Sequence, residues 1–510
     1  MSSINNKQNK KEFSTVKRRV LLTGWVVALT AFAVLALALT SCKKFLDVQP
    51  QDKVPQTTLF KEEQGFKDAL TGVYLGMDKV PGGGMTFGLY TNDLTMGMIS
   101  TLAFEYDNAT TANAGTNGTF FNNVVYYYYT DPTVRAEIDG IWSSMYTNIA
   151  NLNNIISQID SRESIFTADN FNRIKGEAVA LRAFFHFDLA RMFGQSPATG
   201  MNVKAIPYIR SFGVRSTPFA TLQHVLDSCI DDLSTAKELL ANTDTTAVQK
   251  AGDDAFTAYT QNHMNYWAVQ ALMARVYLYK GDRDNADKYA KAVIGSNKFP
   301  LITSNVAAAN STPRDRTFSQ ELVFSLYSNT VRNSNGNLFD KPSNTTPLRL
   351  LPAGKTTLYV TGSGSINDYR YTSWFDNNQA AVNVPSKYFQ NTGLPYHLQN
   401  IVPLIRASEM YYIAAEAAQA KGDISGGASF LNKVRQARGL TALNASGITN
   451  TDSLSREIMK EYQKEFIQEG QTFFYYKRLN KDLRQVTATN AAIPADVYVF
   501  PIPEKEKEYN

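Results

Sequence analysis

The sequence predicts an all-α fold, built from repeated helix pairs and interrupted by one long irregular insert. Apolar residues recur at spacings of three and four over several segments, which is the period of an amphipathic helix. Two of these segments are helical hairpins with a turn at Gly281-Asp282 and at Gly422-Asp423. Residues 301–400 lose this period and are rich in Asn, Ser, Thr, Gly and Pro.

The N-terminal segment has the pattern of a lipoprotein signal peptide. Lys17-Arg18-Arg19 precede an apolar run from Val20 to Leu39, and Cys42 follows Thr40-Ser41. A run of this length can also span a bilayer, but the basic start and the small residues before the cysteine favour cleavage. We therefore expect residues 1–41 to be removed and Cys42 to be lipidated, because several acyl chains anchor a protein firmly.

The charge balance does not favour a nucleic-acid partner. The chain has 51 basic and 46 acidic side chains, but residues 1–41 hold six of the basic ones and one acidic one. The remainder therefore has a formal net charge of zero, whereas nucleic-acid binding requires a clustered positive surface. With Cys42 lipidated, Cys229 has no disulfide partner, and its amphipathic surroundings predict a small core residue.

The helical part is expected to follow an extended tether at residues 42–56. Apolar spacing predicts a helix from Thr57 to Tyr74, which Pro81-Gly82-Gly83-Gly84 would end. Residues 85–135 are predicted to form a loop, because they are rich in Asn, Thr and Gly and carry scattered aromatic residues. Helical periodicity resumes beyond it and predicts helices over residues 141–156, 174–193 and 218–240.

The hairpins at residues 264–294 and 406–438 match the tetratricopeptide pattern of small residues at close-approach positions and a glycine turn. We count about four helix pairs in all, including residues 141–193, which are enough to stack a continuous core. The insert at 301–400 includes one strand-like segment, Glu321 to Leu326. We therefore divide the mature chain into a helical part at 57–300, this insert and a C-terminal part at 401–510.

Several motifs in a fixed order make the chain resemble a known family, the SusD/RagB lipoproteins of Bacteroidetes. The resemblance runs from Cys42 to the C-terminus. The segments that carry it are Cys42-Lys43-Lys44-Phe45-Leu46-Asp47 with Pro50, then Trp142, Tyr146, Ile149 and Asn153, Glu177-Ala178 through Phe193-Gly194, Arg406 through Arg435, Glu465-Phe466 with Glu469-Gly470, and Phe500-Pro501-Ile502-Pro503.

The resemblance implies a tetratricopeptide scaffold with an irregular ligand-binding face. It also implies a partner, a SusC-like TonB-dependent barrel in the outer membrane, over which the lipoprotein sits as a lid. The chain ends at Tyr509-Asn510, slightly earlier than family members usually do. We do not expect this difference to affect the binding face.

Candidate ligand-binding residues follow from what a sugar requires. Exposed aromatic rings offer flat apolar surfaces to sugar rings, and neighbouring Asn, Asp and Arg side chains bind the hydroxyl groups. Two such clusters lie where the family's ligand aromatics occur, after the first helix and in the long insert. The candidates are Phe104, Tyr106, Tyr369, Tyr371, Trp374 and Asn377.

The alternative for these rings is that they pack the insert onto the helices. Asp368 and Arg370 also resemble a family motif, which we expect to be an internal ion pair. Tyr126 to Tyr129 would alternate sides in an extended segment, so at most half of them can face a ligand. We expect them to belong mainly to the core.

The sequence predicts no catalytic residue, metal site or cofactor. Five helical glutamates could be hydrolase carboxylates, but pairing between helices with Arg182, Arg406, Arg435 and Arg478 is the favoured interpretation. The histidines are not spaced for a metal, and no Gly-x-Ser-x-Gly motif occurs. His186 lies among phenylalanines and is expected in the core. The glutamates are Glu177, Glu409, Glu416, Glu465 and Glu469.

We therefore expect a surface lipoprotein that captures a glycan and delivers it to a transporter, and not an enzyme. Three alternatives remain open at this stage. The ligand could be a peptide, the chain could be a scaffold whose only partner is a protein, or it could be a surface glycosidase. The aromatic and Asn-rich loops favour a sugar.

Overall fold

The structure, a computed structural model, describes residue 25 and residues 56–79, 88–106, 118–243, 254, 256–302, 314–339, 348–350, 358–359, 368–376, 384–390, 393–444, 448–484, 493–494 and 496–508. The chain forms two compact units, Met1–Lys61 and Glu62–Asn510. The first includes the short helix α2 (Gln56–Leu59). The predicted cleavage site, Cys42 and Asn377 lie outside the described residues. No helix within the described ranges is long and apolar enough to cross a membrane.

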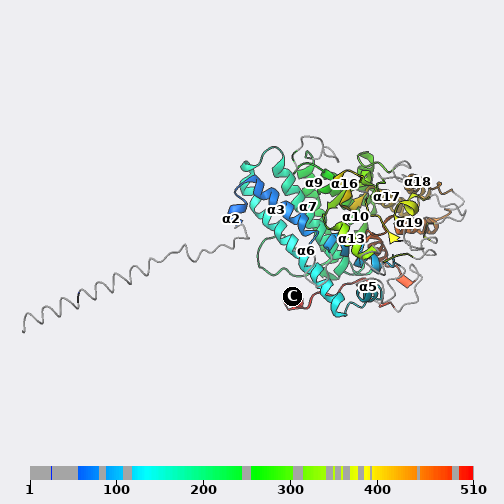
Figure 1. The fold of residues 1–510 in the computed structure, drawn as a ribbon, viewed down its shortest axis with the longest axis horizontal. Coiled ribbons are helices and arrows are strands. Elements are labelled where there is room, and N and C mark those ends of the chain that lie inside the picture. Colours follow the sequence, from blue (N-terminus) through cyan, green and yellow to red (C-terminus); the bar gives the residue numbers. More distant parts are fainter. Residues whose placement is uncertain are drawn as a thin grey trace, which may run out of the picture. The chain divides into compact units, whose positions relative to one another are not determined.

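The second unit is a stack of helices, in which each helix packs against the next one along the chain. Figure 1 shows α3, α6 and α7 side by side. This arrangement confirms the predicted all-α repeat fold, since every helix buries its apolar face against two neighbours. The stacked helices are α3 (Glu63–Gly76), α6 (Pro132–Ile159), α7 (Asn170–Phe193), α9 (Leu222–Leu240), α10 (Tyr266–Lys280), α11 (Arg283–Gly295), α17 (Ala407–Ala420), α18 (Ile424–Ala437) and α19 (Thr451–Glu465).

The two predicted Gly-Asp turns are present. Gly281 ends α10 with φ +90°, and Gly422 follows α17 with φ +76°, a left-handed conformation that glycine adopts without steric cost. The following Asp282 and Asp423 each accept a hydrogen bond from the backbone N–H three residues on. They therefore cap α11 and α18, as acidic residues at helix starts commonly do.

The insert leaves the stack after α11 and returns at α17, and these two helices pack directly against each other. Its predicted strand is present as β3 (Leu322–Tyr327), which pairs antiparallel with β6 (Ile401–Arg406). The pair thus joins the start of the insert to its end. The other described strands form two short antiparallel pairs, β1 (Lys204–Ile206) with β2 (Ala220–Thr221) and β4 (Phe375–Asp376) with β5 (Val384–Pro385).

The loop predicted over residues 85–135 is wrong in its described parts. It contains the π-helix η2 (Leu89–Asp93) and the helices α4 (Met98–Leu102) and α5 (Gly118–Val125). Residues 88–103 are all buried. Such helices are too short to show a period in the sequence. The remaining short helices include α8 (Pro197–Gly200), α13 (Val331–Phe339), α15 (Tyr369–Ser373), α16 (Tyr396–Gln399), α20 (Gln471–Arg478) and α22 (Glu504–Lys507).

Three buried arginines converge on one glutamate in the core of the second unit. The Glu465 carboxylate contacts Arg370 at 2.9 Å, Arg406 at 2.5 Å and Arg438 at 2.5 Å. Arg438 also binds Glu321 through two hydrogen bonds of 2.7 Å. Burial by itself would raise the pKa of Glu465, but the arginines outweigh it and hold this pKa well below the ordinary value.

The predicted internal pair of Asp368 and Arg370 belongs to the same network and is confirmed, with an N–O distance of 2.7 Å and both side chains fully buried. Arg370 contacts Glu461 of α19 as well, at 2.8 Å. The network therefore fastens the insert to the C-terminal helices. Charges removed from water in this way are tolerated only when each has a partner.

We predict that Arg370→Ala lowers the free energy of unfolding by about 3–5 kcal/mol, because it leaves buried carboxylates without a partner. Urea unfolding monitored by circular dichroism measures this loss. The matched control is Arg484→Ala, whose side chain is 62% exposed beside Asp482 and should cost less than about 0.5 kcal/mol. Equal losses in the two variants would contradict a structural role for the network.

A second buried group consists of two carboxyl groups without a cation. Asp93 ends η2 and Glu137 lies in α6, and both are fully buried. Among the described residues, no N–H or O–H group of another residue donates a hydrogen bond to their carboxyl oxygens. The two carboxyl groups are in contact with each other. Burial raises the pKa of Glu137 to about 7 and that of Asp93 well above its ordinary value. The pair therefore holds at least one proton below neutral pH.

This pair predicts that stability falls as the pH rises from about 4.5 through 7, because a carboxyl group with a raised pKa keeps its proton longer in the folded state than in the unfolded chain. Glu137→Gln should flatten that fall, since the amide stays neutral. Thermal unfolding at pH 5, 7 and 9 measures the slope for each variant. Exposed Glu238→Gln is the control, and a slope unchanged by Glu137→Gln would refute the assignment.

Candidate functional site

Two of the predicted ligand-binding rings lie in the core. Tyr106 has no exposed surface, and its hydroxyl donates to the Met96 carbonyl at 2.6 Å. Trp374 is 1% exposed, its Nε1–H donates to the Arg316 carbonyl at 2.7 Å, and the Lys387 ammonium lies 3.7 Å from the ring centre. The expectation that these rings are exposed is therefore wrong, because aromatic residues in a loop are also what packs a long insert onto a scaffold.

The other predicted rings are half-buried. Phe104 adopts φ +56° and lies 6.2 Å from the Tyr127 ring. Tyr369 and Tyr371 lie on α15, where Tyr371 is 6.2 Å from the ring of Tyr359. These three side chains keep some accessible surface, so a ligand contact for them stays a prediction. In the tyrosine run, Tyr127 is buried as expected, whereas Tyr128 is 55% exposed.

For Trp374 the structure predicts a loss of stability instead of a specific loss of affinity. Removing a buried indole leaves a cavity, so Trp374→Ala should lower the free energy of unfolding by about 3–5 kcal/mol. Urea unfolding measures this effect, with Tyr128→Ala as the exposed aromatic control. If Trp374→Ala unfolded at the same urea concentration as the native chain, the buried position of this ring would be contradicted.

A group of exposed and half-buried aromatic residues gathers instead at the end of the β3–β6 pair. Tyr327 is the last residue of β3, and Tyr396 begins α16, just before β6. Antiparallel pairing brings them together, with ring centres 6.1 Å apart. Both hydroxyl groups donate to Oδ1 of Asn329, at 3.2 Å and 3.4 Å. Tyr396 is 64% exposed.

A second ring pair extends this group. The half-buried His397 follows Tyr396, and its ring lies 4.8 Å from the half-buried Tyr259. Partial burial lowers the pKa of His397 below its ordinary value, so its ring is neutral at pH 7. The Nδ2 amide of exposed Asn329 has no partner among the described residues. We call Tyr259, Tyr327, Asn329, Tyr396 and His397 the tyrosine platform.

One carboxylate from the start of the chain positions the centre of the platform. Asp78 follows α3 and accepts hydrogen bonds from the hydroxyls of Ser328 at 2.6 Å and of Thr330 at 2.7 Å. These two residues flank Asn329. A third hydroxyl, that of Thr91, binds the same carboxylate at 2.7 Å. Asp78 thereby holds the residues on both sides of Asn329, whose side-chain oxygen accepts hydrogen bonds from Tyr327 and Tyr396.

Sequence reasoning missed the whole platform. The predicted strand stopped at Leu326, one residue before Tyr327. One pattern in the sequence could have indicated it. A tyrosine is followed by an asparagine within a few residues near each edge of the insert, at residues 327–329 and 396–400. These segments meet only because β3 pairs with β6, and nothing local in the sequence specifies that pairing.

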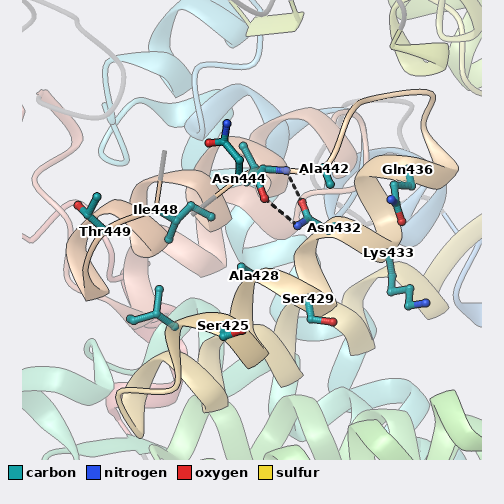
Figure 2. Close-up of a pocket in the computed structure, with 12 residues that line it drawn as sticks. Ser425, Ala428, Ser429, Asn432, Lys433, Gln436, Ala442, Asn444, Ile448 and Thr449 are labelled. Atoms are coloured by element: carbon teal, nitrogen blue, oxygen red, sulfur yellow. Dashed lines mark hydrogen bonds between the residues drawn. The ribbon is translucent and has the colours of Figure 1, made fainter. Parts of the chain in front are cut away.

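A hollow of about 780 Å³ lies elsewhere, along α18. It is bounded by this helix, by residues 442–444 and by residues 448–449. Figure 2 shows Asn432 fastening the far wall: its Nδ2 donates to the Leu443 carbonyl at 3.2 Å, and its Oδ1 accepts from the Leu443 N–H at 2.7 Å. No aromatic residue lines this hollow, so it offers no surface for stacking a sugar ring.

The helical glutamates are engaged in structural contacts. Glu465 and Glu469 pair with Arg406, and Glu416 pairs with Arg478, as predicted. The predicted pairing differs elsewhere, because other partners lie closer. Glu409 binds Arg275, Glu177 accepts from Tyr74 and contacts His263, Arg182 binds Asp232, and Arg435 binds Glu461.

Other residues that could carry chemistry also lie in the core. His186 is fully buried, its Nε2 accepts from the Ile209 N–H at 2.9 Å, and burial lowers its pKa to about 3. Cys229 is buried and unpaired. Within the described part of the chain, no group of three His, Cys, Asp or Glu side chains could hold a metal ion.

The fold is that of a helical-repeat protein, and four of the five platform residues lie in its long insert. Comparison with known proteins agrees with this class. Residues 44–278 match the SusD-like family described as "Starch-binding associating with outer membrane", and residues 241–509 match the SusD family. The second match alone covers more than half of the chain, and the chain belongs to the SusD family, as the sequence motifs predicted.

Similar proteins extend over nearly the whole chain. SusD-like protein P38 of Formosa agariphila is 22% identical over 93% of this chain and 95% of its own length, and SusD-like protein P2 of the same organism is 25% identical over 88% and 90%. A SusD-like carbohydrate binding protein from Bacteroides vulgatus superposes with a TM-score of 0.66 at 18% identity, covering 88% of this chain and 96% of that one. A SusD superfamily protein from Bacteroides thetaiotaomicron gives 0.62 at 20% identity, covering 88% and 98%. These structures share the tetratricopeptide-like fold.

Proposed function

We propose that this protein is an outer-membrane lipoprotein, anchored through Cys42 and facing the cell exterior, that binds a glycan on the tyrosine platform. It then delivers the glycan to a SusC-like TonB-dependent transporter, over which it closes as a lid. The binding step is an equilibrium and requires no covalent chemistry. Membership of the SusD family and the family's outer-membrane description support this proposal, as does the carbohydrate-binding relative of similar fold.

The platform is the observation that carries the proposal. Sugar rings present apolar faces edged by hydroxyl groups, and they bind to aromatic surfaces that have amides beside them. Tyr396 offers an exposed ring, and the Nδ2 of Asn329, which has no partner among the residues that the structure describes, offers two donors next to it. Tyr259 and His397 extend the aromatic surface.

The alternatives find less support. A glycosidase needs two carboxyl groups across a cleft, whereas the helical glutamates named above lie in the interior with partners of their own. A peptide that adds to a sheet edge binds through main-chain hydrogen bonds, whereas the platform offers rings and a side-chain amide.

We predict that the chain from Lys43 onward binds at least one member of a panel of oligosaccharides, and that Tyr396→Ala weakens this binding at least about tenfold, or about 1.4 kcal/mol. Isothermal titration calorimetry measures both affinities. Tyr128→Ala, an equally accessible tyrosine outside the platform, is the matched control and should bind like the native chain.

Three results would contradict parts of this proposal. Equal affinity of Tyr396→Ala and the native chain would leave glycan binding intact but remove the platform as its site. Binding of oligopeptides instead of oligosaccharides would replace the ligand class. Binding of neither ligand by a folded native chain would favour the scaffold alternative.

A further inference from the structure

The segments that form the tyrosine platform contain no acidic residue. Tyr259 lies within residues 256–265, Tyr327 and Asn329 within 327–339, and Tyr396 and His397 within 393–400; none of these segments includes Asp or Glu. Acidic side chains make up about half of the charged residues in the chain, so such a face differs from the rest of the molecule. Apart from Asp78, whose carboxylate accepts three hydroxyl hydrogen bonds, these segments would not repel a negatively charged ligand.

Two exposed cationic residues are close in sequence to the residues that position the centre of the platform. Arg332 is exposed in the first turn of α13, two residues after Thr330. Lys79 is exposed and directly follows Asp78. Among the described residues, neither side chain forms a hydrogen bond or an ion pair. Thr330 donates to Asp78 at 2.7 Å. Lys79 is the residue after Asp78, and Arg332 is two residues after Thr330, so both cationic residues are close in sequence to this hydrogen bond.

The carboxylate at that contact does not cancel them. Asp78 accepts three hydroxyl hydrogen bonds, from Thr91, Ser328 and Thr330, and forms no ion pair with either cation. Lys79, Arg332 and Asp78 together have a formal net charge of +1.

From this juxtaposition we infer that the protein selects acidic glycans, whose uronic carboxylates or sulfate esters bind Arg332 and Lys79 while a sugar ring stacks on the tyrosines. Guanidinium groups bind planar or tetrahedral oxyanions through paired N–H donors, and an ammonium adds a point charge. The inference rests on the proposed function, because it names the ligand class of the same site.

The test compares three hexasaccharides of equal length: maltohexaose, which is neutral, hexagalacturonate, which carries carboxylates, and a carrageenan hexasaccharide, which carries sulfates. Calorimetry with the chain from Lys43 onward measures each affinity in low salt. At least one acidic ligand should bind about tenfold tighter than the neutral one. That advantage should shrink in 0.5 M NaCl, because salt screens exposed charges.

Charge reversal identifies the residues that carry the selectivity. Arg332→Glu combined with Lys79→Glu should reduce the affinity for the acidic ligand at least about tenfold, with binding of the neutral ligand changed less than about twofold. Both positions are exposed, so thermal unfolding should be unaffected. Lys460→Glu is the control, since this lysine of α19 is 56% exposed and lies outside the platform.

The outcomes separate this inference from the proposed function. Tighter binding of either acidic ligand, lost on charge reversal, supports the inference and identifies carboxylate or sulfate as the anion. Equal binding of neutral and acidic ligands, or a preference that survives charge reversal, overturns the inference and leaves glycan binding in place. Binding of no glycan overturns the proposed function and this inference with it.

Discussion

The convergence of Arg370, Arg406 and Arg438 on Glu465 is the interaction on which the rest of the structure depends. Arg406 is the last residue of β6, and Glu321, which pairs with Arg438, directly precedes β3. The network therefore holds one end of the β3–β6 pair inside the scaffold. Because these charges are fully desolvated, they have one low-energy arrangement, in which every carboxylate meets its arginine.

The other end of the same strand pair carries the tyrosine platform, so a buried electrostatic constraint sets the position of an exposed aromatic face. Tyr327 and Tyr396 belong to segments far apart in the sequence, and Asp78 adds a fixed point from a third segment. A rigid repeat scaffold that presents binding residues on irregular segments separates stability from recognition. In this protein the buried arginines serve stability, whereas the rings and the amide of the platform are proposed to serve recognition.

Aromatic residues in the insert have two different roles, and burial distinguishes them. Trp374 and Tyr106 fill the contact between insert and helices, each with its polar atom bound to a backbone carbonyl. Tyr396 has nearly two thirds of its surface exposed, and its hydroxyl donates to a side-chain amide oxygen. Composition alone could not separate these roles, since both kinds of ring stand beside Asn, Asp or Arg in the sequence.

The sequence by itself determined the helical scaffold, because helix period, glycine turns and capping aspartates are local properties that the residues of α10, α11, α17 and α18 express directly. It also predicted the buried pair of Asp368 and Arg370 and the core position of His186. Only the tertiary structure decided which strands pair, which glutamate receives three arginines and which tyrosines reach the surface. Those outcomes depend on contacts between residues that are distant in the chain, and local patterns do not encode them.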